Sequence, residues 1–384
     1  MRERSAAERI ARGHPWVWRD ALDRGIDDVA CGEEVRLRGP DGTPLGHGLA
    51  DPGSPIAVRM WTHGDEPMTP HLWETRCERA CKLRDRLFRD TRTDAFRVLH
   101  GEGDRVPGFV ADRYGPVVVV RTDGDGAAAR LDDLVGPLWS ALRHRGVTTL
   151  AVRTGARGQT VRVEGVRGAP LADVVRVEEH GVPFLVDLAR GQKTGAFLDQ
   201  RENRRRVGEL ARGRRVLNLF SYAGGFSLTA ALGGASHVTS VDVAAAAHAT
   251  AQLSFRAAGV DPRAHAFVTA DVTSFLDGAR ARGERWDLVV SDPPSFAPNE
   301  RAVSRALAAY RSLHRACAAV LASDGILCAA SCSSHVDAGA FLGTLDDASL
   351  GRSMGLIELA GAGPDHPTLA AFPEGRYLKF AILT

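Results

Sequence analysis

The chain has 384 residues, 44% of them hydrophobic and 25% charged, an ordinary composition for a globular protein of two or three domains. A formal net charge of +2 does not by itself indicate a nucleic-acid partner, so local clusters must carry that argument. No run of about 18 apolar residues occurs, so we expect no membrane span. Six irregularly spaced cysteines and the lack of an apolar stretch after Met1 favour a reducing, cytoplasmic setting.

The first 67 residues are predicted to form a small β-rich domain. Residues 34–38 alternate between apolar and polar with period two, and Asp41-Gly42 is a typical hairpin turn. Residues 56–61 form a further expected strand. A stretch containing Gly and Pro, residues 64–70, marks the expected boundary.

A central α+β domain is expected over residues 68–175. It begins with a basic amphipathic helix over residues 72–89, whose apolar stripe includes Trp73, Cys77 and Cys81. A second helix is expected over residues 128–143. The expected strands are residues 95–99, 109–111, 117–121 and 149–153.

The last domain, residues 176–384, is predicted to be an α/β domain with a Rossmann-like sheet. A hairpin over residues 177–187 leads into it. From Arg215 onward, strands and helices alternate, which is typical of βαβ units and a parallel sheet. The expected strands are residues 216–220, 238–241, 266–268, 288–291 and 326–330, and a long helix is expected over residues 303–321.

Candidate binding residues collect where ligands of such sheets bind, outside the carboxyl ends of the strands. Gly224 and Gly225 follow the first strand and permit close backbone approach. Asp242 ends the second strand, where a carboxylate suits the two hydroxyls of a ribose. The next three strands are followed or ended by Asp271, Asp292 and Cys332.

Two cofactor classes compete for this edge. A nicotinamide cofactor is less favoured, because the loop lacks the Gly-x-Gly-x-x-Gly spacing that brings a pyrophosphate to a helix N-terminus. S-adenosylmethionine (SAM) has a carboxylate and an ammonium group instead, and fits the Gly-Gly pair with Asp242 better. Purely structural roles remain open as well: the glycines can mark a tight turn, and Asp242 or Asp271 can cap the helix that follows.

The turn Asp292-Pro293-Pro294 and Cys332 together suggest methylation of a base carbon. The prolines remove two N–H donors, so the turn offers carbonyls and one carboxylate to the polar edge of a flipped base. Phe296 either stacks on that base or lies in the core. The C5 carbon of cytosine is a poor nucleophile until a thiolate attacks C6, which requires an accessible cysteine of lowered pKa.

These segments resemble the bacterial 23S ribosomal RNA (cytosine-C5)-methyltransferases that carry an N-terminal PUA domain. The resemblance spans nearly the whole chain and implies a PUA domain, a central domain and a SAM-binding class I methyltransferase domain. Many relatives carry Lys where Ser295 stands. The segments that carry the resemblance are residues 12–17, 97–104, 107–115, 178–181, 193–201, 219–226, 292–294, 331–333, 365–367 and 372–379.

The resemblance implies that Cys332 is the covalent nucleophile, and we expect Asp292 to hold the N3 edge of the base and to share a proton. The implied partner is 23S ribosomal RNA, with no metal, and the chain is a monomer or a homodimer. The group that removes the C5 proton is not identified, although His335 is near in sequence. The expected SAM-binding residues are Phe220, Ser221, Tyr222, Gly224, Gly225, Asp242, Asp271, Asp292 and Gln200.

Two other functions stay open. Asp-Pro-Pro turns also grip amino groups, so the acceptor could be a nitrogen in RNA or a small molecule. A non-catalytic RNA-binding factor with a vestigial donor site is the third hypothesis. The run of residues 199–215, with seven Arg and three acidic residues, is either a solvated helix face or a patch that contacts phosphates.

Overall fold

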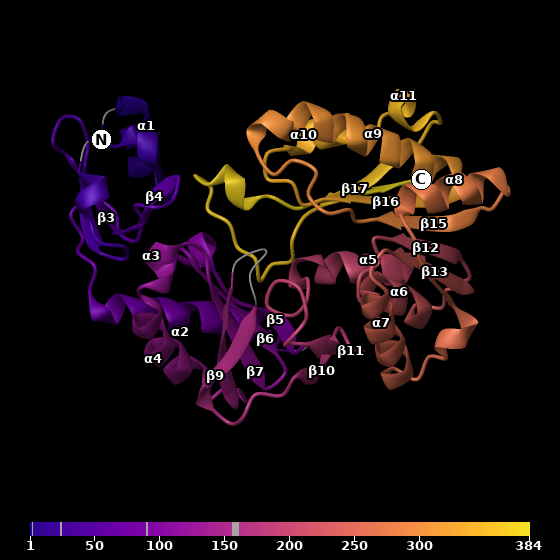
Figure 1. The fold of residues 1–384 in the computed structure, drawn as a ribbon, viewed down its shortest axis with the longest axis horizontal. Coiled ribbons are helices and arrows are strands. Elements are labelled where there is room, and N and C mark those ends of the chain that lie inside the picture. The colour runs from indigo at the N-terminus through magenta and orange to yellow at the C-terminus, as the bar shows by residue number, and fades with distance from the viewer. Residues whose placement is uncertain (2, 24, 90, 156–160) are drawn as a thin grey trace. The chain divides into compact units, whose positions relative to one another are not determined.

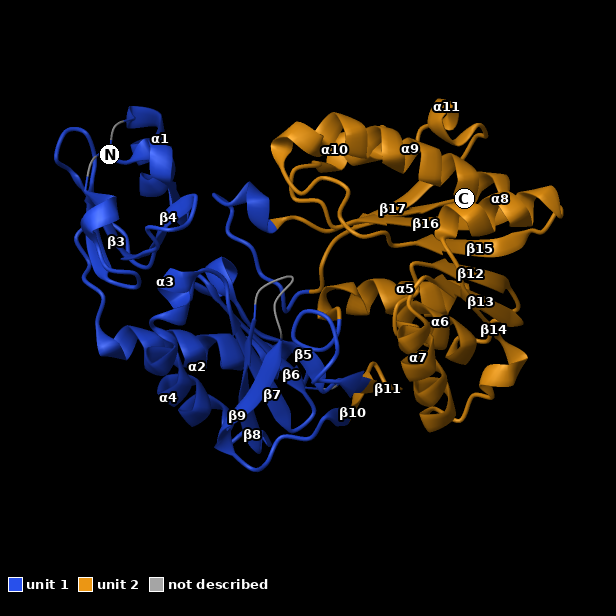
Figure 2. Cartoon of the chain, in the orientation of Figure 1, with its two compact units in different colours: residues 1–175, 186–196, 364–375 blue, residues 176–185, 197–363, 376–384 orange. Residues whose placement is uncertain are grey.

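The computed structural model describes residues 1, 3–23, 25–89, 91–155 and 161–384, which group into two compact units (Figure 2). Two late segments, residues 186–196 and 364–375, belong with the N-terminal half of the chain. The three predicted domains, with boundaries near residues 67 and 175, divide the chain more finely than these two units, and those boundaries remain predictions. Unit 1 is residues 1–175, 186–196 and 364–375, and unit 2 is residues 176–185, 197–363 and 376–384.

Unit 1 begins with a four-stranded antiparallel sheet of order β1-β4-β3-β2. The predicted hairpin at Asp41-Gly42 is present, and Gly42 supplies its positive φ of 83°. Helix α1 packs Ala7 and Ile10 into a small core with Val58. The elements are α1 (Arg4–Ala11), β1 (Trp16–Trp18), β2 (Glu34–Arg38), β3 (Pro44–Ala50) and β4 (Ile56–Met60).

The rest of unit 1 is built on a five-stranded sheet of order β5-β6-β7-β8-β9 (Figure 1). Helices α2 and α4 pack on it. Trp73 and Cys77 of α2 are buried as the predicted stripe requires, and Leu138 of α4 is buried beside them in the same core. The helix expected over residues 128–143 corresponds to α4, and the short helix α3 precedes it. The elements are α2 (Pro70–Leu87), β5 (Ala95–His100), β6 (Phe109–Tyr114), β7 (Val117–Thr122), α3 (Asp125–Ala128), α4 (Leu131–Leu142), β8 (Thr149–Thr154) and β9 (Arg162–Gly168).

Unit 2 holds a seven-stranded sheet of order β14-β13-β12-β15-β16-β18-β17 (Figure 1). The five predicted strands are present and parallel, whereas β18 is antiparallel to both β16 and β17. The strands are β12 (Arg215–Leu219), β13 (His237–Asp242), β14 (Ala266–Thr269), β15 (Trp286–Ser291), β16 (Leu321–Ser331), β17 (Leu356–Ala360) and β18 (Lys379–Leu383). The hairpin β10 (Val174–Glu179) and β11 (Val182–Asp187) precedes it in sequence.

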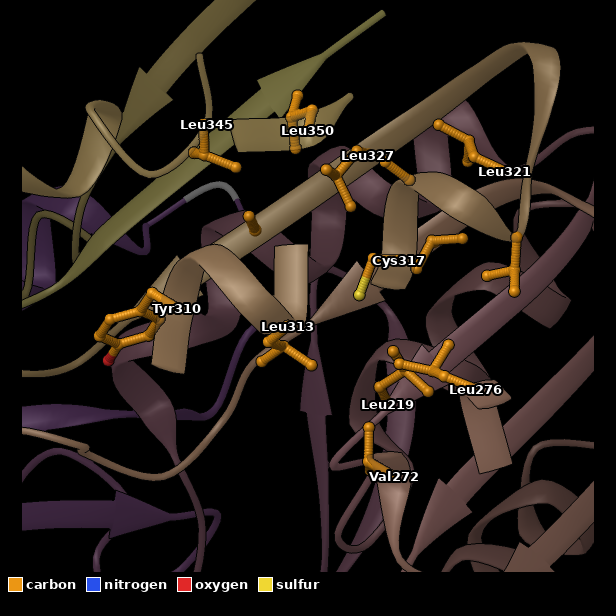
Figure 3. Packing of buried hydrophobic residues seen from close by; sticks show 14 of the residues in the cluster. Leu219, Val272, Leu276, Tyr310, Leu313, Cys317, Leu321, Leu327, Leu345 and Leu350 are labelled. Carbon is orange, nitrogen blue, oxygen red and sulfur yellow. The ribbon is translucent and has the colours of Figure 1, made fainter. Parts of the chain in front are cut away.

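Helices cover both faces of this sheet, as in a doubly wound fold. On one face, α9 contributes Tyr310 and Leu313 and α8 contributes Leu276 to a core with Leu219 and Leu327 (Figure 3). On the other face, α5 and α6 pack on the alternate strand residues. The helices are α5 (Arg201–Leu210), α6 (Gly225–Leu232), α7 (Ala245–Ala257), α8 (Val272–Ala281), α9 (Val303–Ala319), α10 (Ala338–Leu342) and α11 (Asp347–Leu350).

The fold matches the predicted class: an α/β protein with an N-terminal β-rich sheet, a central sheet with helices and a Rossmann-like domain. Within the described ranges, none of the helices is both long enough and apolar enough to span a bilayer.

Candidate active site

The strand register brings the predicted site residues to one edge of the unit 2 sheet. Leu219 pairs with Val241 on one side and with Ser291 on the other, so β12, β13 and β15 end at the same level. Ser291 pairs with Ala329, which places the end of β16 two residues further on. The segments that follow these strands carry the glycines, Asp242, Asp292 and Cys332.

The loop after β12 has an unusual backbone. Phe220 and Tyr222 have positive φ angles of 56° and 45°, and Gly224 follows at 75°. Left-handed backbone at residues other than glycine costs roughly 1–3 kcal/mol and clusters at ligand sites. The Ser221 N–H donates to the Val241 carbonyl (3.0 Å), which ties the loop to β13.

Close packing constrains both glycines of this loop, and Gly224 more strictly than Gly225. A Cβ at Gly224 would lie 2.8 Å from the Cβ of Ala251 in α7, and a Cβ at Gly225 would lie 2.9 Å from Cδ of Arg204. Only the second contact involves a flexible side chain. Gly224 therefore allows the loop to lie directly against α7, which is a stronger constraint than a turn alone.

The Asp242 carboxylate joins two segments of the edge. One oxygen accepts the Tyr222 N–H (2.8 Å) and the other accepts the Ala244 N–H (2.9 Å), while the residue stays half-buried. Each oxygen keeps a lone pair for a further donor. A half-exposed carboxylate beside a glycine cradle fits the ribose and the methionine part of SAM.

Asp271 and Gln200 make local contacts in the structure. Asp271 is exposed and caps α8 by accepting the Ser274 N–H (2.9 Å), a bond that lowers the pKa of its carboxyl. Gln200 is buried, and its Oε1 accepts from Nδ2 of Asn203 (2.6 Å). These contacts give both residues structural roles, and their roles in cofactor binding remain predictions.

Asp292 and Cys332 stand directly after neighbouring parallel strands, β15 and β16. The link between their loops is the buried Ser333, which sequence reasoning missed. Its Oγ shares hydrogen bonds with Oγ of Ser295 (3.0 Å) and with the hydroxyl of Tyr310 (3.1 Å). Ser295 thus holds the Asp-Pro-Pro turn against the segment that carries the thiol.

Of the two predicted positions for Phe296, in the core or stacked on a base, the structure shows the core position. Its ring centroid is 4.8 Å from that of Tyr310, and the side chain packs against the cluster shown in Figure 3. His335 is exposed in the loop after Cys332.

Burial separates Cys332 from the other cysteines. Cys332 is half-buried, and Cys31 is exposed in unit 1. Burial raises the pKa of the Cys317 and Cys328 thiols to about 12, so both are fully protonated near neutral pH. Cys77 and Cys81 are buried in the α2 stripe, as predicted. Of the described cysteines in unit 2, Cys332 has the accessibility that a nucleophile needs.

Many arginines of residues 199–215 are bound to carboxylates. Arg204 makes a bidentate pair with Glu179 (2.7 and 2.8 Å), and both side chains are almost completely buried. Arg205 pairs with Glu209, and Arg206 pairs with Glu358. A cavity of about 340 Å³ lies between α5, α6 and the β10–β11 turn. The run is therefore more than a solvated helix face, because it anchors α5.

Across the described ranges, His, Cys, Asp and Glu side chains do not gather in groups of three or more that could hold a metal ion. The site instead offers a glycine cradle and a carboxylate at the edge of a doubly wound sheet. These features define a doubly wound, Rossmann-like domain, a class in which ligands bind at this edge of the sheet.

Comparison with known proteins specifies the class. A family model described as S-adenosylmethionine-dependent methyltransferase matches residues 128–373, and a PUA-like domain model matches residues 3–63. The chain belongs to the S-adenosylmethionine-dependent methyltransferase family, and SAM is its cofactor.

Its relatives cover nearly its whole length. It is 34% identical over 376 residues to ribosomal RNA large subunit methyltransferase I of Shigella boydii serotype 4, covering 96% of this chain and 95% of the relative. The protein of that name from Escherichia coli K12 is 33% identical over the same length. The solved structure of SMU.776 complexed with SAH has a TM-score of 0.88 at 23% identity and covers 99% of this chain and 98% of that chain, which shows a shared fold.

Proposed function

We propose that this protein methylates the C5 carbon of a cytosine in 23S ribosomal RNA, with Cys332 as a covalent nucleophile. The observation that carries the proposal is the position of the half-buried Cys332 after β16, beside the Asp292-Pro-Pro turn after β15. The substrate class is supported by the relatives that are named ribosomal RNA large subunit methyltransferase I.

The chain's own residues supply the activation. The Cys332 thiolate forms a bond to C6, and the electron pair of the C5=C6 double bond then makes C5 nucleophilic. Asp292 holds the N3 edge and shares a proton as the adduct forms. SAM supplies the methyl group. Loss of the C5 proton to a base then returns the electron pair, and the S–C6 bond breaks.

The proposed SAM-binding residues lie in the loop after β12, at Asp242 and at three further positions. They are Phe220, Ser221, Tyr222, Gly224, Gly225, Asp242, Asp271, Asp292 and Gln200. The positive φ angles at Phe220 and Tyr222 and the close packing at Gly224 support the loop. Asp242 is the proposed partner of the SAM ribose. Its carboxylate already accepts a hydrogen bond from the Tyr222 N–H, which ties it to the same loop.

The test is a covalent trap. A 23S ribosomal RNA transcript containing 5-fluorocytidine is incubated with SAM and the protein. Fluorine at C5 cannot leave as a proton does, so the adduct accumulates and is seen as a shifted band on a denaturing gel. The wild type is expected to form the adduct, Cys332→Ala is expected to form none, and Cys31→Ala should match the wild type.

The outcomes separate the three functions. Methylation retained by Cys332→Ala would select a nitrogen acceptor or a small molecule instead. RNA binding without measurable binding of S-adenosylhomocysteine in calorimetry would select a non-catalytic RNA-binding factor. An adduct that persists in Cys332→Ala overturns the assigned nucleophile.

A further inference from the structure

A buried lysine lies beside the candidate nucleophile. Lys379 is the first residue of β18, and the antiparallel register pairs it with Ser331, the last residue of β16. Only 4% of its surface is exposed. The residue directly after its partner in the sheet is Cys332, and the reaction proposed above gives Lys379 no role.

The hydrogen bonds of Lys379 hold it against the loop of the thiol. Its Nζ donates to the carbonyl oxygens of Ser333 (2.6 Å) and Tyr377 (2.8 Å). The Ser333 side chain is already fixed by Ser295 and Tyr310. Ser333, the residue after Cys332, is therefore held at two points. Lys379 of β18 binds its carbonyl oxygen, and Ser295 of the Asp-Pro-Pro turn binds its side chain.

Two carbonyl groups are poor compensation for a buried ammonium, which needs an anion in its surroundings. Burial lowers the pKa of Lys379 to about 8, while attraction to Cys332 and to Asp337 acts in the opposite direction. Attraction between two groups is mutual. A cation that the thiolate stabilises also stabilises that thiolate relative to the neutral thiol.

Of the other titratable groups around this position, Asp337 and Tyr310 do not replace the thiolate. Asp337 is exposed and caps α10 by accepting the Ala340 N–H (2.8 Å). Tyr310 stays neutral near pH 7, because burial raises the pKa of its hydroxyl. Asp292 follows the neighbouring strand, and His335 is exposed in the Cys332 loop.

We infer that Lys379 is a positioning residue for Cys332, which fixes the loop of the thiol and stabilises the thiolate form. The thiol loses one proton to solvent and Lys379 keeps its own protons, so the ammonium supplies charge and orientation only. The inference rests on the proposed function in one respect, that Cys332 is the nucleophile. The reactivity of its thiol is nevertheless measurable without RNA.

The experiment follows alkylation by iodoacetamide in the full-length protein from pH 5.5 to pH 10, read for each cysteine by peptide mass spectrometry. The exposed Cys31 serves as an internal reference in every sample. In the wild type, the midpoint of the Cys332 rate profile is expected to lie below about 8.5, the ordinary pKa of a free thiol. Lys379→Met should slow Cys332 alkylation at pH 7 by about tenfold, the effect of a midpoint raised by about one pKa unit. Lys379→Arg should recover most of the rate, because the positive charge is retained.

An unchanged Cys332 profile in Lys379→Met that still binds S-adenosylhomocysteine overturns the inference. Should that variant not fold, a wild-type Cys332 midpoint at or above about 8.5, the ordinary pKa of a free thiol, overturns it equally. The 5-fluorocytidine trap separates the two proposals. Failure of the wild type to form the adduct, together with a low Cys332 midpoint, removes the proposed reaction but leaves the role of Lys379.

Discussion

Gly224 offers the sharpest test of how the proposed cofactor loop is held, because the chain provides a matched control. Gly224 and Gly259 both have a φ of 75°. Gly224 lies against α7, and Gly259 follows the C-terminal end of α7. A Cβ at Gly224 would lie 2.8 Å from the Cβ of Ala251, whereas a Cβ at Gly259 would meet nothing within 4 Å. Replacement by alanine adds the same backbone strain at both positions and a steric clash at only one.

The expected magnitudes follow from that difference. Left-handed strain costs about 1–2 kcal/mol in both variants. Gly224→Ala adds overpacking against α7, a further cost of about 1–3 kcal/mol. The clash must also displace the loop that carries Tyr222, whose N–H is held by Asp242 (2.8 Å). We therefore expect Gly224→Ala to bind S-adenosylhomocysteine at least about tenfold more weakly, equivalent to about 1.4 kcal/mol.

Isothermal titration calorimetry with S-adenosylhomocysteine and urea unfolding, run on both variants and the wild type, provide the measurements. Gly259→Ala should keep the wild-type affinity for S-adenosylhomocysteine. Its free energy of unfolding should fall only by the cost of the added backbone strain. Equal losses of stability and affinity in the two variants would refute the reasoning, since backbone strain alone would then account for both. A wild-type affinity in Gly224→Ala would show that the loop does not hold the cofactor.

Three further predictions concern single side chains. Asp242→Asn should weaken S-adenosylhomocysteine binding by about tenfold in calorimetry, because it removes a charged acceptor, whereas Asp261→Asn, at an exposed cap, should not. Burial lowers the pKa of His314 to about 4, so the neutral ring stabilises the fold above pH 6.5 and that stability is lost as the pH falls towards 4. The free energy of unfolding should drop by about 2 kcal/mol more between pH 7 and pH 5 in the wild type than in His314→Gln, measured by urea unfolding at both values. Glu179→Gln leaves the buried Arg204 without its counter-charge and should lower that free energy by about 3–5 kcal/mol, while Glu179→Leu combined with Arg204→Met should recover most of it.

The parallel strands of unit 2 could be predicted because each is a short apolar run between turn signals. The residues after them could be placed on one edge because parallel strands end together. The register confirms this reasoning for Asp242, the last residue of β13, and for Asp292, which follows β15, because both strands pair with β12. Cys332 follows the next strand, and its half-buried state distinguishes it from Cys328 in the same strand.

The sequence could not predict the antiparallel end of the sheet. Strand β18 pairs with β16, from which it is separated by about 50 residues that include a segment belonging to unit 1. Strand β17 lies at the sheet edge and exposes Leu356, Ile357 and Leu359, so it lacks the alternation that marks a half-buried strand. Pairing at this distance depends on tertiary structure, which no local pattern encodes.

Charge at the candidate site depends on that unpredicted strand. The family resemblance predicts that Ser295 removes a positive charge from the Asp-Pro-Pro turn. In the structure, the Ser295 hydroxyl forms a hydrogen bond with the Ser333 hydroxyl (3.0 Å). The Ser333 carbonyl oxygen accepts a hydrogen bond from the Lys379 ammonium (2.6 Å). The positive charge beside the Cys332 loop is therefore that of Lys379 in β18, not that of a residue in the Asp-Pro-Pro turn. A lysine held inside the sheet is a better electrostatic partner than one on an exposed turn, because water screens it less.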